Sequence, residues 1–380
     1  MEKRKLENLG IETSLLGFGC MRFPVTKDNK IEETEAEKMI DLAYESGVNY
    51  FDTAYPYHDG DSEPFVGKAL NKFDRESYYL ATKLPIWLVE KEEDTVRLFE
   101  EQLKRLDKDY IDFYLLHALD KDRWDKAKSC KVVETCEKLQ KEGKIRYLGF
   151  SFHDEYQIFE DIITSRKWDF CQIQYNYMDT KENPGRKGYD LAEKLNVPLV
   201  IMEPIRGGSL ASFSDDINAV FEKSDKNKSV ASYALRWVAS HPNVKVILSG
   251  MSTMEQTKDN LKTFTDYEPF TDQEENVIQE VVKMLENRVQ NPCTGCRYCM
   301  PCPAWVDIPQ NFKTWNNYHI FQDYNVVRYS WEQGIAETAQ AKNCVQCGKC
   351  EEVCPQHINI REDLIKVQKD LDQAKAAASK

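Results

Sequence analysis

Ile111-Asp-Phe-Tyr-Leu-Leu-His117 is a short apolar run, rich in aromatic and aliphatic side chains, that ends on a histidine. A run of this kind between charged segments is typical of a strand buried in a parallel sheet. Seven comparable runs occur in the first 250 residues of the 380-residue chain. They lie at Leu15–Gly19, Tyr50–Thr53, Tyr78–Lys83, Tyr147–Ser151, Phe170–Gln174, Pro198–Met202 and Val244–Ser249.

Amphipathic stretches separate these runs, for example at residues 33–46, 93–106 and 229–240. Eight alternating strands and helices within about 250 residues predict an α/β fold, the (β/α)8 or TIM barrel. A doubly wound open sheet is the alternative, and we disfavour it because no Gly-x-Gly-x-x-Gly motif opens a helix here. We expect the barrel at residues 1–270, a linker helix at 271–290, and a small, mainly helical domain at 291–380.

The charge and hydropathy patterns exclude several classes of function. The formal net charge of −13 opposes binding to a phosphate backbone, so we expect no nucleic-acid partner. No apolar run approaches the roughly 18 residues that cross a membrane, and residues 1–10 do not resemble a signal peptide. We therefore expect a cytoplasmic protein without a membrane partner. Disulfides are rare in that compartment, so the 12 cysteines need another explanation.

Eight of the cysteines gather between residues 293 and 354. They form two closely spaced runs: Cys293, Cys296, Cys299 and Cys302, and then Cys344, Cys347, Cys350 and Cys354. The second run matches the C-x2-C-x2-C-x3-C-P signature of a bacterial-type [4Fe–4S] cluster. The first run is one residue shorter before its last cysteine, which leaves the role of Cys302 less defined. Zinc on paired C-x2-C steps is the alternative, although each run has more cysteines than that pattern needs.

In this signature the fourth cysteine ligates the other cluster. The expected ligand sets are therefore Cys293, Cys296, Cys299 and Cys354 for one cluster, and Cys344, Cys347, Cys350 and Cys302 for the other. The region resembles helical two-cluster ferredoxins, in which a helical insert separates the motifs. We expect the aromatic residues of the insert to pack around the clusters. We expect the remaining cysteines to be small buried apolar residues; they are Cys20, Cys130, Cys136 and Cys171.

Polar residues end most of the predicted strands. They are Asp52, Lys83, His117, Ser151, Gln172, Glu203 and Ser249. In a barrel these ends meet at the face that carries the active site. Asp52, Lys83 and His117 end successive strands, and three ionisable groups are costly to bury there unless they pair. Such pairing marks functional sites.

Tyr57 follows Asp52 in the loop after the second barrel strand. We expect the Lys83 ammonium group to lower the pKa of Tyr57 from about 10, so that it works as a general acid near neutral pH. Asp52 would keep Lys83 charged and oriented. His117 would donate a hydrogen bond to a substrate oxygen. The four residues therefore predict a proton relay directed at a carbonyl or an alkoxide.

Residues 5–265 resemble the aldo-keto reductase family. The matching pieces are Asp52-Thr-Ala…Tyr57, Ala81-Thr-Lys83, Leu115-Leu-His117, Gly149-Phe-Ser151, Gln172 and Glu203-Pro-Ile-Arg-Gly-Gly208. The resemblance implies that Tyr57 is the acid/base, with Tyr55 as its rival, that Lys83 and Asp52 tune it, and that His117 orients the carbonyl. It also implies that Ser151 and Gln172 bind a nicotinamide carboxamide. The remaining cofactor-binding residues that we predict are Glu203, Gly207, Gly208, Ser249, Gln256 and Asn260.

The chain departs from the family pattern at two places. Phe152 replaces the usual asparagine after the serine, so one carboxamide contact is missing or His153 supplies it. The cations that bind an adenosine 2′-phosphate are absent after the eighth strand, apart from Lys258, which favours NADH over NADPH. Backbone N–H groups at Gly207 and Gly208 suit a pyrophosphate as well as they suit an ordinary turn.

The combined pattern predicts an oxidoreductase that acts on a small molecule, with Trp87 and Trp124 as candidates to line its pocket. Nicotinamide moves two electrons and each cluster moves one. Three arrangements reconcile these electron counts. The clusters are structural, or a flavin converts between one and two electrons, or the substrate accepts single electrons that ferredoxin or another donor delivers. A redox sensor or scaffold that binds a nucleotide without turnover is the alternative from another functional class.

Overall fold

The computed structural model describes residues 1–379. The chain forms two compact units, one made of residues 1–206 and 229–272 and the other of residues 207–228 and 273–380. This grouping assigns residues 207–228 to the second unit, whereas the expected domain boundaries placed them in the barrel. Among residues 1–379, no helix combines the length and the apolar character that a bilayer crossing requires.

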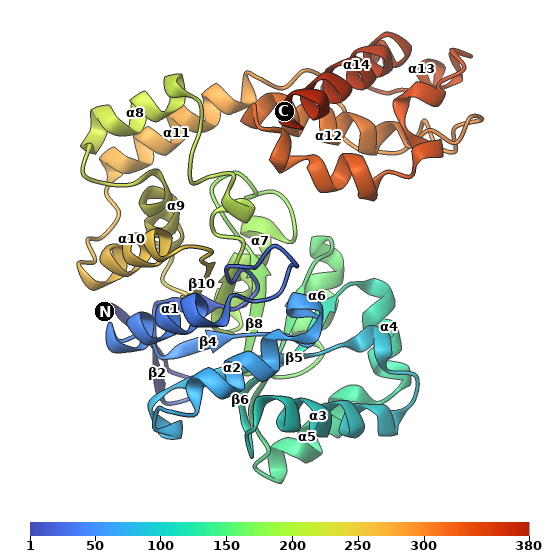
Figure 1. Cartoon of the computed structure of the whole chain (residues 1–380). Helices are drawn as coiled ribbons and strands as arrows, with labels where there is room; N and C mark the ends of the chain where they lie inside the picture. Colours follow the sequence, from blue (N-terminus) through green and yellow to red (C-terminus); the bar gives the residue numbers. More distant parts are fainter. Residues whose placement is uncertain (380) are drawn as a thin grey trace. The chain divides into compact units, whose positions relative to one another are not determined.

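The first unit is a closed barrel of eight parallel strands, as the sequence predicted (Figure 1). In order around the barrel, the strands are β10 (Val244–Gly250), β3 (Leu16–Gly19), β4 (Tyr50–Asp52), β5 (Tyr79–Leu84), β6 (Ile111–Leu119), β7 (Ile145–Phe152), β8 (Phe170–Gln174) and β9 (Leu199–Met202). An antiparallel hairpin of β1 (Lys3–Leu6) and β2 (Ile11–Ser14) precedes the barrel. The sequence patterns located all eight barrel strands but not this short hairpin.

Helices surround the strands (Figure 1). They are α1 (Glu33–Glu45), α2 (Ser62–Leu70), α3 (Glu92–Leu106), α4 (Lys121–Ser129), α5 (Val132–Lys141), α6 (Tyr156–Thr164), α7 (Gly185–Lys194), α9 (Val230–Ala239) and α10 (Met254–Thr265). In helix α3, acidic residues occupy the first turn and basic residues the last, which complements the helix dipole.

An aromatic core fills the interior of the barrel. The ring of Phe113 lies 4.9 Å, centroid to centroid, from the rings of both Tyr50 and Phe170, and 5.0 Å from the ring of Tyr147. Phe113, Tyr50 and Phe170 are fully buried. This packing fixes the strands rigidly, and it leaves the carboxyl ends of the strands to carry polar residues.

The second unit is mainly helical. It contains α8 (Asp215–Asp225), α11 (Asp272–Glu286), α12 (Ile308–Phe321), α13 (Lys349–Glu352) and α14 (Ile360–Ala378). A buried apolar cluster joins α12 to α14, with Phe312 and Val367 fully buried. The indole N–H of Trp315 donates to Asp370 across the same pair of helices, at 2.8 Å.

Four aromatic residues of the insert are buried in this core: Phe312, Trp315, Tyr324 and Trp331. Tyr318 packs against it half-buried, whereas Trp305 is 78% exposed and Tyr329 is 73% exposed. Trp305 has a left-handed backbone with φ of 62° just after the first cysteine run, which turns the chain there. Trp305 and Tyr329 thus lie outside this core, and the expectation that the aromatic set packs around the clusters stays a prediction.

Candidate active site and metal centres

Asp52 and Lys83 form a buried ion pair at the carboxyl end of the barrel. Asp52 ends β4, Lys83 lies near the end of β5, and their side chains are 3% and 1% exposed. The Lys83 Nζ donates to Asp52 Oδ1 at 2.6 Å and to the Thr53 carbonyl at 2.7 Å. Neighbouring parallel strands thus bring together two residues that are 31 positions apart. The contact with the Thr53 carbonyl had no signal in the sequence.

Tyr57 is the tyrosine that faces this pair. Its hydroxyl lies 3.4 Å from Lys83 Nζ, in a turn where His58 and Asp59 adopt left-handed backbone angles. The rival Tyr55 faces the outer helices, where its hydroxyl donates to Glu101 at 2.9 Å. Tyr57 is therefore placed to exchange a proton beside Lys83, and Tyr55 is not.

His117 lies across from Tyr57. The two ring centroids are 6.2 Å apart, and the ring of Trp87 lies 5.2 Å from that of His117. Burial, helped by the charge of Lys83, lowers the pKa of His117 well below its usual value, so the imidazole is neutral at neutral pH. Its buried Nδ1 has no hydrogen-bond partner within residues 1–379. We assign the single N–H to Nε2, which leaves that atom as the donor to a substrate oxygen.

Burial dominates the electrostatics of the site. It raises the pKa of Tyr57 above 10, although the neighbouring Lys83 opposes the rise. The expectation that Lys83 would bring this pKa toward neutrality was wrong, because removing the phenolate from water outweighs the attraction of one ammonium group. Burial opposes the charged form of Lys83, but Asp52 and Tyr57 raise its pKa on balance, so Lys83 stays charged. Tyr57 is consequently a protonated acid at neutral pH.

Trp87 and Trp124 have different environments. Trp87 is partly exposed beside His117, and Arg123 lies over its ring at 5.7 Å. Trp124 is buried against Trp168, with ring centroids 6.4 Å apart. Trp87 therefore lies beside His117 at the surface, and its role in lining a substrate pocket stays a prediction, whereas Trp124 is part of the core.

Two predicted nicotinamide ligands are buried on adjacent strands. Ser151 in β7 is buried and accepts a hydrogen bond from the Ala118 N–H at 2.7 Å. Gln172 in β8 places its Nε2 3.5 Å from the Met202 sulfur, and its buried Oε1 has no partner within residues 1–379. A buried amide oxygen without a donor fits a carboxamide N–H, so these residues suit a nicotinamide ring.

Other predicted nucleotide contacts already have partners within the chain. Asn260 donates to Ser249 at 2.8 Å, and Gln256 accepts from the Ser252 N–H at 2.8 Å at the start of α10. The carbonyl of Glu203, whose φ is 54°, accepts from Asn176 at 3.0 Å. Their roles toward a nucleotide stay predictions.

Gly207 and Gly208 have φ of 64° and 104° in a tight turn that begins the 207–228 segment of the second unit.

Phe152, which stands where the family usually has asparagine, packs on Phe159, with ring centroids 5.2 Å apart. His153 is exposed, and its backbone N–H donates to the Leu119 carbonyl at 3.0 Å.

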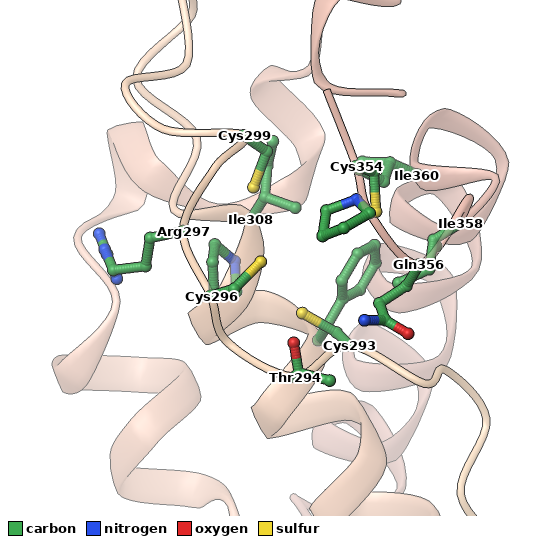
Figure 2. A pocket seen from close by; sticks show the side chains of 13 residues that line it. Cys293, Thr294, Cys296, Arg297, Cys299, Ile308, Cys354, Gln356, Ile358 and Ile360 are labelled. Atoms are coloured by element: carbon green, nitrogen blue, oxygen red, sulfur yellow. The ribbon is translucent and has the colours of Figure 1, made fainter. Parts of the chain in front are cut away.

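In the second unit, the eight cysteines line two neighbouring hollows. Figure 2 shows Cys293, Cys296, Cys299 and Cys354 with their sulfur atoms facing one hollow. Cys302, Cys344, Cys347 and Cys350 line the other, together with Cys299. Each hollow thus draws cysteines from both runs, and Cys299 and Ile308 line both hollows.

The donor set suits iron–sulfur clusters. Thiolate groups are the protein ligands of a [4Fe–4S] cube, and each hollow offers at least four. Among residues 1–379, no three His, Cys, Asp or Glu side chains converge closely enough to hold a single metal ion. Outside the hollows, Cys20, Cys136 and Cys171 are buried and Cys130 is half-buried. Burial raises the pKa of Cys136 to about 12, which makes it an inert thiol.

Relatives of known sequence match different shares of the chain. A Bacillus subtilis protein described as an uncharacterized oxidoreductase is 26% identical over 314 residues, which cover 74% of this chain and 97% of that protein. A Glycine max protein named "Probable aldo-keto reductase 1" is 37% identical over 158 residues, which cover 39% of this chain and 44% of that protein.

Solved structures show the same barrel. The holo form of an aldo-keto reductase from Bacillus halodurans is 28% identical, with a TM-score of 0.62 over 74% of this chain and 96% of that one. A Klebsiella pneumoniae aldo-keto reductase in complex with NADPH has the same TM-score and coverage at 22% identity, a likeness in fold alone.

Two family matches divide the chain. Residues 292–358 match a 4Fe-4S dicluster domain, in agreement with the cysteine spacing. Residues 15–283, more than half of the chain, match the aldo/keto reductase family. The chain therefore belongs to the aldo/keto reductase family and carries a 4Fe-4S dicluster domain after its barrel.

Proposed function

We propose that this oxidoreductase reduces a carbonyl group of a small molecule, with Tyr57 as the proton donor. The observation that carries the proposal is the placement of the Tyr57 hydroxyl 3.4 Å from Lys83, which is itself paired with Asp52 at 2.6 Å. A barrel that only bound a nucleotide would not need a buried ion pair beside a tyrosine, since such a pair is costly to bury.

Each of the four residues has a distinct part in this reaction. The Nε2–H of His117 orients the carbonyl oxygen, and the Tyr57 hydroxyl gives that oxygen a proton. The Lys83 ammonium stabilises the phenolate that Tyr57 becomes, and Asp52 keeps Lys83 charged while both are out of water. Ser151 and Gln172 would hold the carboxamide of a nicotinamide, which when bound supplies a hydride. The preference for NADH over NADPH stays a prediction.

We propose that the two hollows hold [4Fe–4S] clusters that carry electrons. Cys293, Cys296, Cys299 and Cys354 would ligate one, and Cys302, Cys344, Cys347 and Cys350 the other. Nicotinamide exchanges electrons in pairs, whereas each cluster exchanges one. If the barrel only transferred a hydride, neither cluster would take part in electron transfer. A flavin is a possible converter between the two, and extraction of the purified protein tests for it.

We propose that the electron donor is a small acidic one-electron carrier of the ferredoxin type. The hollow lined by Cys347 has an exposed apolar rim, with Tyr298 at 70% and Val345 at 66% exposure. The charged residues that line it are Lys349 and Arg361, and no Asp or Glu lines it. Arg361 pairs with Glu351 at 2.8 Å, so Lys349 is the cation that this apolar rim offers to an acidic partner.

The test begins with anaerobic purification, a visible spectrum and extraction of bound cofactors. Cys347→Ser is then compared with the wild-type protein, using NAD(P)H or a one-electron donor as the reductant. We expect turnover driven by the one-electron donor to fall at least tenfold in the variant. If both activities are unchanged, the clusters do not lie on the electron path, and the proposed role of Tyr57 is left unaffected.

A further inference from the structure

Glu63 is a buried carboxylate that lies outside the four-residue site. It belongs to α2, and its side chain is fully buried. Its Oε1 accepts from the Thr82 hydroxyl at 2.6 Å and from Gln102 Nε2 at 2.7 Å. A buried carboxylate is retained only where its partners offset the loss of water, so the contacts of Glu63 show what it holds in place.

On one side, Glu63 connects to the strand that carries Lys83. Gln102 Nε2, which donates to Glu63, also lies 3.0 Å from the backbone carbonyl of Lys83. Tyr114 donates to Gln102 Oε1 at 2.7 Å, so the amide has only one satisfied orientation. The end of β5 is therefore held through Gln102, at the backbone of the residue whose ammonium group meets Tyr57.

On the other side, Glu63 connects to the turn that carries Tyr57. Its Oε2 lies 3.2 Å from Arg105 Nε, an ion pair that is not aligned as a hydrogen bond. The Arg105 guanidinium donates to the carbonyls of Tyr55 and Gly60, which lie on either side of Tyr57. It also stacks on the Tyr55 ring at 4.3 Å. Arg105 thus holds both ends of the turn.

We propose that Glu63 is a positioning residue that fixes the separation of Lys83 and Tyr57, and this inference rests on the proposed function of Tyr57. Glu63 contacts both Gln102 and Arg105, which lie one turn apart on α3 and hold the strand of Lys83 and the turn of Tyr57, respectively. Proton transfer is sensitive to displacements of about 1 Å, so loosening either connection slows the chemical step without removing a reacting group.

The test compares Glu63→Gln with the matched control Asp112→Asn. Asp112 is equally buried and paired with Arg75 at 2.6 Å and Arg146 at 2.9 Å, but it lies near the start of β6, and Lys83, Asp52 and Tyr57 are not among its contacts. Both changes remove one buried charge, so both should lower the melting temperature. The assays are kcat and KM for carbonyl reduction, the solvent deuterium isotope effect on kcat, and nicotinamide binding by fluorescence.

We expect Glu63→Gln to lower kcat roughly tenfold to a hundredfold, with KM and nicotinamide binding within about threefold of wild type. The solvent isotope effect should increase, because proton transfer then limits turnover. Asp112→Asn should change neither kcat nor the isotope effect. Equal changes in both variants, or a wild-type kcat and isotope effect in Glu63→Gln, would overturn the proposal.

A second route keeps the test decisive if Glu63→Gln does not fold. Arg105→Met removes the contacts to Tyr55 and Gly60 but keeps the apolar stem, and it should lower kcat and increase the isotope effect in the same way; unchanged values would overturn the proposal. If both single variants and the double variant Glu63→Gln/Arg105→Met fold, the double variant should lose no more kcat than the worse single variant. Additive losses of kcat would count against a path that the two residues share. A fully active Tyr57→Phe variant would instead contradict the proposed function, in which Tyr57 is the proton donor.

Discussion

The ammonium group of Lys83 lies 2.6 Å from the carboxylate of Asp52, and both side chains are almost completely removed from solvent. Neither charge would be stable in that place alone, because burying a single ion costs several kcal/mol. The pair therefore exists as a unit, and the Tyr57 hydroxyl 3.4 Å away lies beside a fixed positive charge. The chemistry proposed for the barrel depends on this relationship.

Replacing Lys83 with methionine should both destabilise and inactivate the protein. The change leaves Asp52 buried without a counter-charge, which we expect to cost about 3–5 kcal/mol of unfolding free energy. The double variant Lys83→Met/Asp52→Asn should recover much of that stability and none of the activity. Denaturant melts and steady-state rates measure the two effects, and a double variant that reduces carbonyls normally would contradict the assigned roles.

The pH dependence of reduction should follow the raised pKa of Tyr57. Since burial keeps this pKa above 10, the acid form persists, and reduction should be level through neutral pH and fall only as Tyr57 ionises above pH 10. Alcohol oxidation should rise over the same range. The lowered pKa of His117 predicts no change in rate near pH 6.5. A fall in reduction centred near pH 8 would mean that Lys83 outweighs burial.

The grouping of cysteines can be tested by removing the last cysteine of each run. Cys354→Ser should damage the cluster on Cys293, Cys296 and Cys299, and Cys302→Ser should damage the other. Each variant should lose up to about four of about eight iron atoms per chain. Iron analysis and electron paramagnetic resonance would detect the loss. If Cys354→Ser instead damages the cluster on its own run, the crossed assignment is wrong.

The sequence predicted the barrel because its strands are short, mainly apolar runs that alternate with amphipathic segments, and a run such as Ile111–Leu119 is typical of a buried parallel sheet. The position of Lys83 beside Asp52 follows from parallel topology alone. The sign of the Tyr57 pKa shift could not be predicted, because it depends on burial that no local pattern encodes. The contacts of Glu63 with Arg105 and Gln102 join segments about 40 residues apart and carry no motif.

The grouping of residues 207–228 with the second unit also could not be predicted from the sequence. This segment lies between β9 and α9, where a barrel helix is expected, and α8 has an ordinary amphipathic pattern. Arg288 pairs with Asp216 in this segment at 2.8 Å, an interaction between residues 72 positions apart. Long-range contacts of this kind decide which unit a helix joins, and local sequence does not report them.

The central claim, that Tyr57 supplies the proton in carbonyl reduction, is tested most directly by Tyr57→Phe. The variant keeps the ring and loses only the hydroxyl that lies 3.4 Å from Lys83. We expect kcat for carbonyl reduction to fall by about a hundredfold or more, while nicotinamide binding, measured by fluorescence, stays at the wild-type value. A variant that binds the cofactor and reduces carbonyls at the wild-type rate would contradict this account.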